Sequence, residues 1–292
     1  MTLPDDRQAR EILRGIGLVG VAVFLFALTD AISKYMTQFY PIGFILWIRF
    51  FFHTLVLLAV VGGRQGLGFV RTRRPGIQLT RGLLLPLAAL MFVSAISQMP
   101  LAETVAITFV SPLIVTLLAV VVLKEHVSVG HWIAISCSFA GVLVIIRPGG
   151  DALGWAALLP LGTAFSMAIY QVLTRRIAGL ESTYTSIFYP GLVGVLLFSL
   201  ALPFTWTTPL AWWHLALMIG GGLVNAASHL TLIRAFEHAP ASKLAPFSYT
   251  QIVWSTLVAY VVFGDFPDSW SITGIAVIVA SGIYVAVKVR TH

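Results

Sequence analysis

The chain carries little charge. Only 10% of its 292 residues are Asp, Glu, Lys or Arg, whereas an average soluble domain has about 25%. An average domain of this length would hold about 73 such residues, but the sequence has 18 basic and 11 acidic ones. Apolar residues make up 58%, more than one water-soluble core can bury. We therefore expect lipid to surround most of the chain.

Several common site signatures are also missing. Cys137 is the single cysteine, which excludes a disulfide framework and a paired-cysteine metal site. The seven histidines form no HExxH array. There is no GxxxxGK[ST] segment, and the GxGxxG match at residues 15–20 follows no predicted strand. We expect no metal, no cofactor and no ATP-driven step. Because the cations flank apolar segments, the net charge of +7 indicates membrane orientation and not a nucleic-acid partner.

Ten apolar segments are each close to the roughly 20 residues that cross a bilayer. Glycine, proline and charged residues mark their ends. The sequence predicts helices near residues 15–37, 41–61, 78–97, 101–123, 130–147, 154–175, 184–202, 211–235, 241–263 and 269–288. The predicted fold is an all-α integral membrane protein with ten transmembrane helices. We interpret the first segment as a retained helix and not a cleaved signal, because no A-x-A pattern follows it.

Basic residues are distributed unevenly between the two sets of predicted loops. If the N-terminus is cytoplasmic, all but four of the 18 basic residues fall in cytoplasmic segments. Of these four, Arg147 lies in an outer loop, and Lys34, Arg49 and Arg81 lie within or at the edge of helices. Such asymmetry predicts that both termini are cytoplasmic, in a bacterial-type inner membrane.

The chain also shows an internal repeat. When the second half of the chain is aligned on the first with Pro240 on Pro100, Thr256-Leu257 falls on Thr116-Leu117 and Asp265 falls on Glu125. The alternative is chance similarity between apolar helices. We expect two copies of a five-helix unit, over residues 12–148 and 152–290. Because five is odd, the second copy enters the membrane inverted, a pattern typical of secondary transporters.

Residues 99–149 contain an initial Pro-Leu-Ala, Ser111-Pro112 inside a helix, an acid after that helix, and Gly-Val-Leu before a charged end. This stretch resembles the fourth and fifth helices of EamA-type carriers of the drug/metabolite transporter superfamily. Residues 239–289 resemble the motif more loosely, with Gln251-Ile252 in place of Ser111-Pro112. We therefore expect no proline bend in the ninth helix. The resemblance implies a central cavity lined by helices one, three, four, six, eight and nine, with helices five and ten peripheral.

Four ionisable side chains lie in the first two predicted helices. Asp30 and Lys34 are four residues apart and share a helix face, as do Arg49 and His53. Such groups are costly in a bilayer and face a cavity or a partner. Asp30 and Lys34 form either a structural pair or a site for the ammonium and carboxylate of an amino acid. Arg49 and His53 either clamp a carboxylate, pair with Asp30, or reach the interface.

Other polar and aromatic side chains lie within the later helices. Each of them either binds the solute or has a purely structural role. In the structural role, the hydroxyls bond to their own helix backbone, the amide and imidazole groups form contacts between helices, and the aromatic rings face lipid. The candidate solute-binding residues are Ser94, Thr108, Ser111, Tyr170, Gln171, Asn225, His229, Ser248, Tyr249, Gln251 and Trp254.

A cavity lined by hydroxyls, amides and aromatic rings favours a zwitterion over a highly charged phosphate. The first prediction is a monomeric carrier that exports amino acids, aromatic ones included, and it resembles the aromatic amino-acid exporters of the family. Alternatives are an importer of a nucleoside-like metabolite of the S-adenosylmethionine or flavin type, or an exporter of drugs. A membrane enzyme would need a clustered acid–base or metal site, which the sequence does not offer. Proton coupling and facilitated diffusion both stay open.

Overall fold

The computed structural model describes residues 6–123, 129–147, 154–177, 180–239 and 241–288. These ranges are helical and contain no strand, so the all-α prediction is confirmed for them. The α-helices are α1 (Asp6–Met36), α2 (Ile42–Gln65), α3 (Pro75–Ile96), α4 (Leu101–Thr108), α5 (Ser111–Leu123), α6 (Val129–Ile146), α7 (Leu158–Ile177), α8 (Thr183–Thr205), α9 (Trp212–His238), α10 (Ala241–Ser248), α11 (Thr250–Phe263) and α12 (Ser269–Lys288), and two short 3₁₀ helices cover Leu67–Val70 and Gly154–Ala157.

Six of the described helices are long and apolar enough to cross a bilayer. They are Arg10–Met36, Ile42–Arg64, Pro75–Ile96, Trp155–Thr174, Thr183–Thr205 and Trp212–His238. Shorter apolar helices cover Leu101–Val115, Trp132–Ile146 and Ser269–Tyr284. The chain is therefore a multi-pass membrane protein, while the full set of ten crossings stays a prediction.

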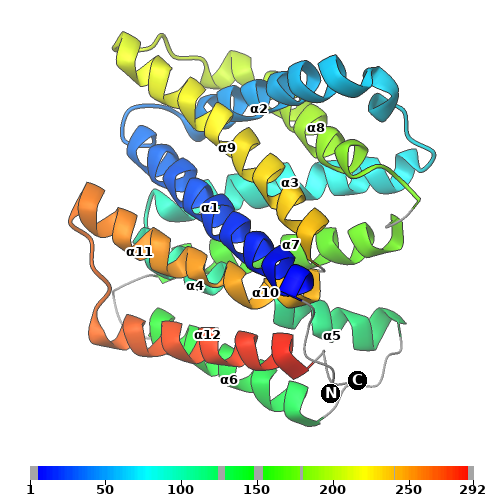
Figure 1. Ribbon diagram of the computed structural model, residues 1–292. Helices are drawn as coiled ribbons and strands as arrows, with labels where there is room; N and C mark the ends of the chain where they lie inside the picture. The colour runs from blue at the N-terminus through cyan, green and yellow to red at the C-terminus, as the bar shows by residue number, and fades with distance from the viewer. Residues whose placement is uncertain (1–5, 124–128, 148–153, 178–179, 240, 289–292) are drawn as a thin grey trace.

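The helices form one bundle in which sequence-distant segments lie side by side (Figure 1). Helix α1 packs along α9 in the middle of the view, α2 packs against α8, and α6 packs against α12 at one edge. Helix α3 contacts α7 and α8, and α11 contacts α1 and α4. Helix α1 begins at the same end of the bundle at which α12 finishes. We call this the terminal end, and the end where α1 stops at Met36 the distal end.

The predicted fourth helix, residues 101–123, is not continuous. It divides into α4 and α5 at Phe109 and Val110, so the prediction of one helix is wrong. Pro112 has no N–H to donate to the carbonyl of Thr108. The N–H of Val110 instead donates to the carbonyl three residues back, on Ile107, at 3.1 Å. The backbone tightens there into a 3₁₀-like turn.

The predicted ninth helix, residues 241–263, divides into α10 and α11 at Tyr249. The expectation that this helix lacks the interruption of the fourth one is therefore also wrong. Pro246 inside α10 takes the place of the missing proline at 252, and the N–H of Tyr249 donates to its carbonyl at 3.4 Å. In the repeat alignment Tyr249 corresponds to Phe109. The two interruptions thus fall at equivalent positions of the two halves.

Helices α6 and α12 approach each other closely because glycines meet at their crossing. A Cβ atom on Gly274 would lie 2.6 Å from the carbonyl oxygen of Gly141, and one on Gly141 would lie 2.9 Å from that of Gly274. Small residues allow helix backbones to pack tightly in membranes, where lipid supplies no hydrophobic drive. This crossing fixes the edge of the bundle opposite to α2 and α8 (Figure 1).

Candidate functional site

Five polar side chains from both halves of the chain meet inside the bundle, and we call them the Arg49 cluster. Arg49 and His53 come from α2, Asp30 from α1, and Asn225 and His229 from α9. Nη2 of Arg49 donates to Oδ1 of Asn225 at 3.0 Å, and Nη1 lies 3.8 Å from Oδ1 of Asp30. The amide nitrogen of Asn225 lies 3.0 Å from Nδ1 of His53. The rings of His53 and His229 are 5.2 Å apart.

This cluster satisfies groups that would otherwise be costly in the membrane. Asp30, His53 and Asn225 are only 5%, 4% and 4% exposed, and a buried polar group without a partner costs free energy. Since the oxygen of Asn225 accepts from Arg49, its amide is left to donate to Nδ1 of His53, which places the proton of a neutral imidazole on Nε2. Asn225 thereby links the two halves of the chain.

The helix geometry explains why these residues meet. Arg49 and His53 are four residues apart on α2, and Asn225 and His229 are four apart on α9, so each pair points from one face. Gly222 precedes Asn225 by one turn, and a Cβ atom there would lie 3.2 Å from the carbonyl oxygen of Arg49. The missing side chain lets α9 approach α2 closely enough for the amide to reach the guanidinium.

Lys34 does not belong to this cluster, and the predicted pair with Asp30 is wrong. Its ammonium lies 3.1 Å from Oδ2 of Asp265 and donates to the carbonyl of Met99 at 3.2 Å. The longer reach of lysine carries the ammonium toward the distal end, where the segment between α11 and α12 supplies Asp265. Asp30, one turn deeper, faces Arg49 instead.

A second acid at the distal end also joins two helices. Asp268 precedes α12 and accepts from the backbone N–H of Ser271 at 2.8 Å. It also pairs with the guanidinium of Arg147, which follows α6. The N–H of Ser271 and the guanidinium both favour the carboxylate, and together they lower the pKa of Asp268 to about 2. The start of α12 is thus tied to the end of α6.

The sequence analysis placed Arg81 within or at the edge of a helix but did not include it among the candidate site residues. Arg81 of α3 meets Gln78 of the same helix, Tyr170 and Thr174 of α7, and the backbone of Ser186 in α8, and we call these five residues the Arg81 cluster. Tyr170, a predicted solute-binding residue, lies here and not with Asn225. A lone arginine one turn after a glutamine in an apolar helix was the available signal.

The interrupted helices bring aromatic rings together. The rings of Phe109 and Tyr249 are 5.0 Å apart. Tyr249 is buried, and its hydroxyl has no hydrogen-bond partner among the described residues. The ring of Trp254 contacts Phe24 of α1 at 5.0 Å, but Trp254 is 37% exposed and shares a helix face with the exposed Leu257. Tyr249 thus lies inside the bundle, with its hydroxyl against Gly282 of α12, whereas Trp254 lies at the surface of the bundle.

The other predicted residues are distributed along their helices. The hydroxyl of Thr108 donates to the carbonyl of Thr104 at 2.9 Å, as small hydroxyls in helices commonly do. Ser111 is buried at the start of α5. Half-buried positions are occupied by Ser94, Gln171, Ser248 and Gln251. In the part of the chain that the structure describes, the predicted set thus lies partly in the Arg49 cluster, partly in the Arg81 cluster and partly near the helix interruptions, while Ser94, Gln171 and Trp254 belong to none of these groups.

Comparison with known proteins agrees with this architecture. The sequence profile of the EamA-like transporter family matches twice, over residues 13–147 and 154–287. The chain belongs to this family. As an EamA transporter of the drug/metabolite transporter superfamily, it is a multi-pass protein of the inner membrane that moves a small molecule.

Characterised relatives match over nearly their whole length. An S-adenosylmethionine uptake transporter of Rickettsia bellii is 27% identical, over 91% of this chain and 93% of its own. A riboflavin transporter of Vibrio cholerae is 28% identical, over 94% and 93%. A pseudopaline exporter of Pseudomonas aeruginosa is 26% identical, over 92% and 94%. A solved crystal structure with 19% identity superimposes with a TM-score of 0.69 over 94% of this chain and 98% of its own, which shows a shared fold.

Proposed function

We propose that this protein is a secondary carrier for a nucleoside-like metabolite, with S-adenosylmethionine as the first candidate and riboflavin as the second. The observation that carries the proposal is the pair of matched helix interruptions at Phe109 and Tyr249. In inverted-repeat carriers, solute sites form where helices at corresponding positions of the two halves are discontinuous. The substrate class is supported by the full-length similarity to carriers of these two compounds.

The interruptions supply groups that suit such a solute. Helices α5 and α11 begin at Ser111 and Thr250, part-way along the predicted fourth and ninth spans, so the positive ends of their dipoles lie at the interruptions and favour an anionic group there. The rings of Phe109 and Tyr249 offer stacking surface for a flat base. S-adenosylmethionine combines an adenine ring with a carboxylate, and both features match this arrangement.

Alternating access follows from the repeat. We take residues 12–148 and 152–290 as the two five-helix units, with both termini cytoplasmic. Each helix of one unit has an equivalent in the other unit, five predicted helices further along the chain. The contact between α1 and α9 is thus equivalent to the contact between α7 and α3, and the contact between α2 and α9 is equivalent to the contact between α8 and α3. Two such half-bundles can rock against each other and open the interruptions to one side and then the other. No covalent step is needed, so we propose a carrier and not an enzyme.

Amino-acid export, the first prediction from the sequence, is tested by the same assay. The methionine part of S-adenosylmethionine carries the ammonium and carboxylate of a free amino acid, so one cavity can be challenged with both. The compounds to compare are S-adenosylmethionine, riboflavin and phenylalanine. Counterflow is the suitable measurement, since it detects exchange without knowledge of the coupling ion.

The full chain would be reconstituted in liposomes loaded with one unlabelled compound, and uptake of the labelled compound would be followed. We expect accelerated exchange of S-adenosylmethionine, reduced by Phe109→Ala and by Tyr249→Ala. Tyr260→Ala is the matched control, because Tyr260 lies on α11, which continues from Tyr249, but is exposed. If phenylalanine were the only one of the three compounds exchanged, the substrate would be an amino acid, as first predicted from the sequence. If Tyr260→Ala reduced exchange as much as Phe109→Ala and Tyr249→Ala do, the solute site would not be at the interruptions.

A further inference from the structure

Arg81 is a buried cation surrounded by uncharged acceptors. It is 1% exposed and lies six residues into α3, about 9 Å from the terminal end. Its guanidinium donates to Oε1 of Gln78 at 2.7 Å, to Oγ1 of Thr174 at 3.0 Å and to the hydroxyl of Tyr170 at 3.1 Å. A longer bond of 3.4 Å reaches the carbonyl of Ser186. The Tyr170 ring also lies 4.6 Å from the guanidinium carbon.

No carboxylate of the described residues forms an ion pair with Arg81. The other cations inside the bundle differ, because Arg49 faces Asp30 and Lys34 faces Asp265. An uncompensated charge in a low-dielectric interior is expensive, and residues of this kind in membrane proteins mark ligand pathways. The Arg81 cluster therefore satisfies the hydrogen bonds of the guanidinium but leaves its charge without a counter-ion.

Comparison of the two repeats shows which group the Arg81 cluster lacks relative to the Arg49 cluster. In the repeat alignment Tyr170 occupies the position of Asp30, and Thr174 occupies that of Lys34. The Arg49 cluster joins α9 to α1 and α2, and the Arg81 cluster joins α3 to the equivalent helices α7 and α8. Where one cluster has a carboxylate beside its arginine, the other has a phenol. A negative charge from outside the chain would complete the second cluster.

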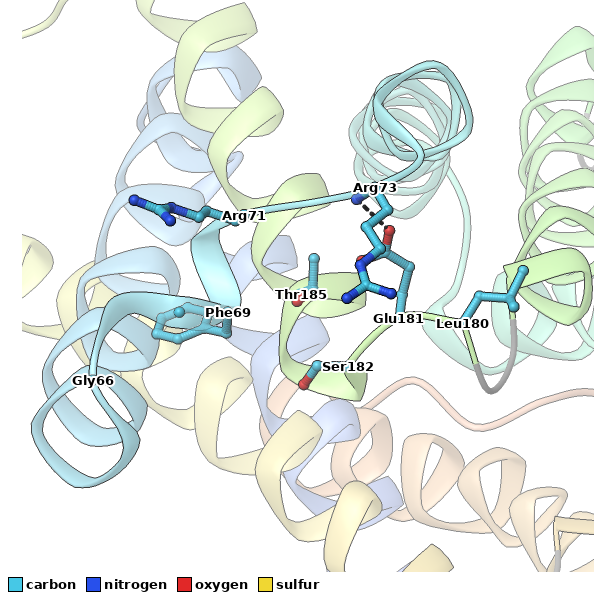
Figure 2. Close-up of a pocket in the computed structure, with 9 residues that line it drawn as sticks. Gly66, Phe69, Arg71, Arg73, Leu180, Glu181, Ser182 and Thr185 are labelled. Carbon is cyan, nitrogen blue, oxygen red and sulfur yellow. Dashed lines mark hydrogen bonds between the residues drawn. The ribbon is translucent and has the colours of Figure 1, made fainter.

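A basic entrance lies next to this cluster. A hollow of about 570 Å³ opens at the terminal end between the α2–α3 and α7–α8 connections (Figure 2). It is lined by the exposed cations Arg71 and Arg73 and by the buried Thr185, whose chain neighbour Ser186 accepts from Arg81. Glu181 also lines it, and its Oε1 accepts from the backbone N–H of Arg73 at 2.8 Å, as Figure 2 shows, so the charged side chains of the lining are two arginines and one glutamate. Positive side chains at a mouth raise the local concentration of anions.

We propose that Arg81 is an anion-binding residue, which takes a carboxylate or phosphate oxygen of the carried solute when the terminal end opens. That the anion is part of the solute rests on the function proposed above. In the closed bundle Tyr170, Thr174 and Ser186 hold the guanidinium in its place. An arriving anion competes for the same N–H groups and so weakens the bonds between α3 and α7 and α8. Anion binding and opening of the terminal end are then coupled, because the anion binds better to the open state.

The first test measures anion binding without transport. The full chain in an uncharged detergent would be unfolded by heat in potassium phosphate or succinate, against potassium chloride of equal ionic strength. We expect the two oxyanions to raise the Tm by roughly 2–4 °C at saturation. Arg81→Gln should abolish this rise, and Arg81→Lys should keep part of it. Arg64→Gln, an exposed cation at the same end, should respond as the wild type does.

A second variant separates binding from mere support of the fold. Tyr170→Phe removes one neutral competitor for the guanidinium while leaving Arg81 in place. If Arg81 binds anions, the oxyanions should act at a concentration lower by about fivefold or more in this variant, because the guanidinium has lost one hydrogen bond that competes with the anion, and about fivefold corresponds to about 1 kcal/mol. A structural arginine predicts no such change. This variant also keeps the test valid if Arg81→Gln does not fold.

Three results would overturn the proposal. An oxyanion effect that persists in Arg81→Gln would place the anion elsewhere. If the oxyanion concentration at half of the Tm rise were unchanged in Tyr170→Phe, Arg81 would have only a structural role. A Tm rise with mixed detergent micelles that contain phosphatidylglycerol, but not with soluble oxyanions, would identify the ligand as a lipid headgroup.

Transport then tests the link to the solute. In counterflow, Arg81→Gln should raise the KM for S-adenosylmethionine, which has a carboxylate, by about tenfold or more. The KM for riboflavin, which has none, should change less than about twofold. Equal increases for both solutes would contradict a role in anion recognition. If the wild type carries neither compound, the proposed function fails, while the thermal experiment still decides whether Arg81 binds an oxyanion.

Discussion

The ion pair between Asp30 and Arg49 offers the most quantitative test of the structure. At 3.8 Å, two unit charges attract by about 4 kcal/mol if the effective dielectric constant is near 20. Asp30→Asn removes this attraction and leaves Arg49 buried, with its bond to Asn225 as the side-chain hydrogen bond that the described residues give it. We expect Asp30→Asn to lower the free energy of unfolding by about 3 kcal/mol. Arg49→Gln should cost at least as much, because it also breaks the bond to Asn225.

The pair is best measured as a double-mutant cycle. Once Asp30 is neutral, Arg49→Gln removes a charge that no longer has a partner, so the double variant should be more stable than the sum of the single losses predicts. We expect a coupling free energy of about 2–4 kcal/mol. Equilibrium unfolding by SDS in mixed micelles, followed by tryptophan fluorescence, supplies the four free energies.

The matched control is the second charge pair of α1. Lys34 and Asp265 lie closer together, at 3.1 Å, but the Asp265 side chain is 43% exposed. Solvent screening should limit the Lys34→Gln and Asp265→Asn coupling to below about 1 kcal/mol. If the Asp30 and Arg49 losses simply add, within about 0.5 kcal/mol, the buried pair contributes nothing and the reasoning from burial is refuted.

Three further predictions concern other parts of the bundle. Gly274→Ala should destabilise the protein by about 1–3 kcal/mol in the same unfolding assay, because its Cβ atom would meet the backbone of α6. Gly220→Ala, which has open space around the new Cβ atom, should be neutral or slightly stabilising. Equal changes in the free energy of unfolding for the two variants would contradict the close crossing. Because the pKa of Asp268 is lowered, its carboxylate contributes fully to stability above about pH 4, and this contribution is lost as the pH falls toward 2. The Tm measured from pH 2 to 5 should therefore change less with pH for Asp268→Asn than for the wild type. Tyr249→Phe should keep or raise stability by up to about 1 kcal/mol, because the hydroxyl has no described partner, while a loss of counterflow in the folded variant would assign the hydroxyl to the solute.

The all-α fold was predictable because apolar length and charge punctuation act over some 20 residues at a time. The interruptions at Phe109 and Tyr249 were predictable only in part. The residues on the two sides of each break join into one apolar segment in the sequence, and the change from i−4 to i−3 hydrogen bonding depends on backbone geometry within one turn. Pro112 signalled the first break. Pro246 signals the second, but it lies three residues before the turn and outside the position that the repeat assigns to a proline.

Spacing within a helix predicted which side chains share a face, as with Arg49 and His53. It did not predict which helix that face meets. Closeness in sequence favours a pair between Lys34 and Asp30, yet Asp265, 231 residues away, receives the ammonium. Pairing across the bundle is decided by how the helices pack, and a single sequence contains little information on that.

The two arginine clusters show the same limit at the level of the repeat. The repeat alignment predicts equivalent helices, and the structure brings equivalent helices together around Arg49 and around Arg81. It does not predict equivalent chemistry, because the arginine comes from the second helix of its half in one cluster and from the third in the other. The acid of the first cluster has a phenol, Tyr170, as its counterpart. The chain itself therefore supplies a counter-charge to Arg49, whereas no carboxylate of the described residues forms an ion pair with Arg81. If the two ends of the carrier open in turn, as we propose, an anionic group would favour opening of the Arg81 end without acting equally on the other.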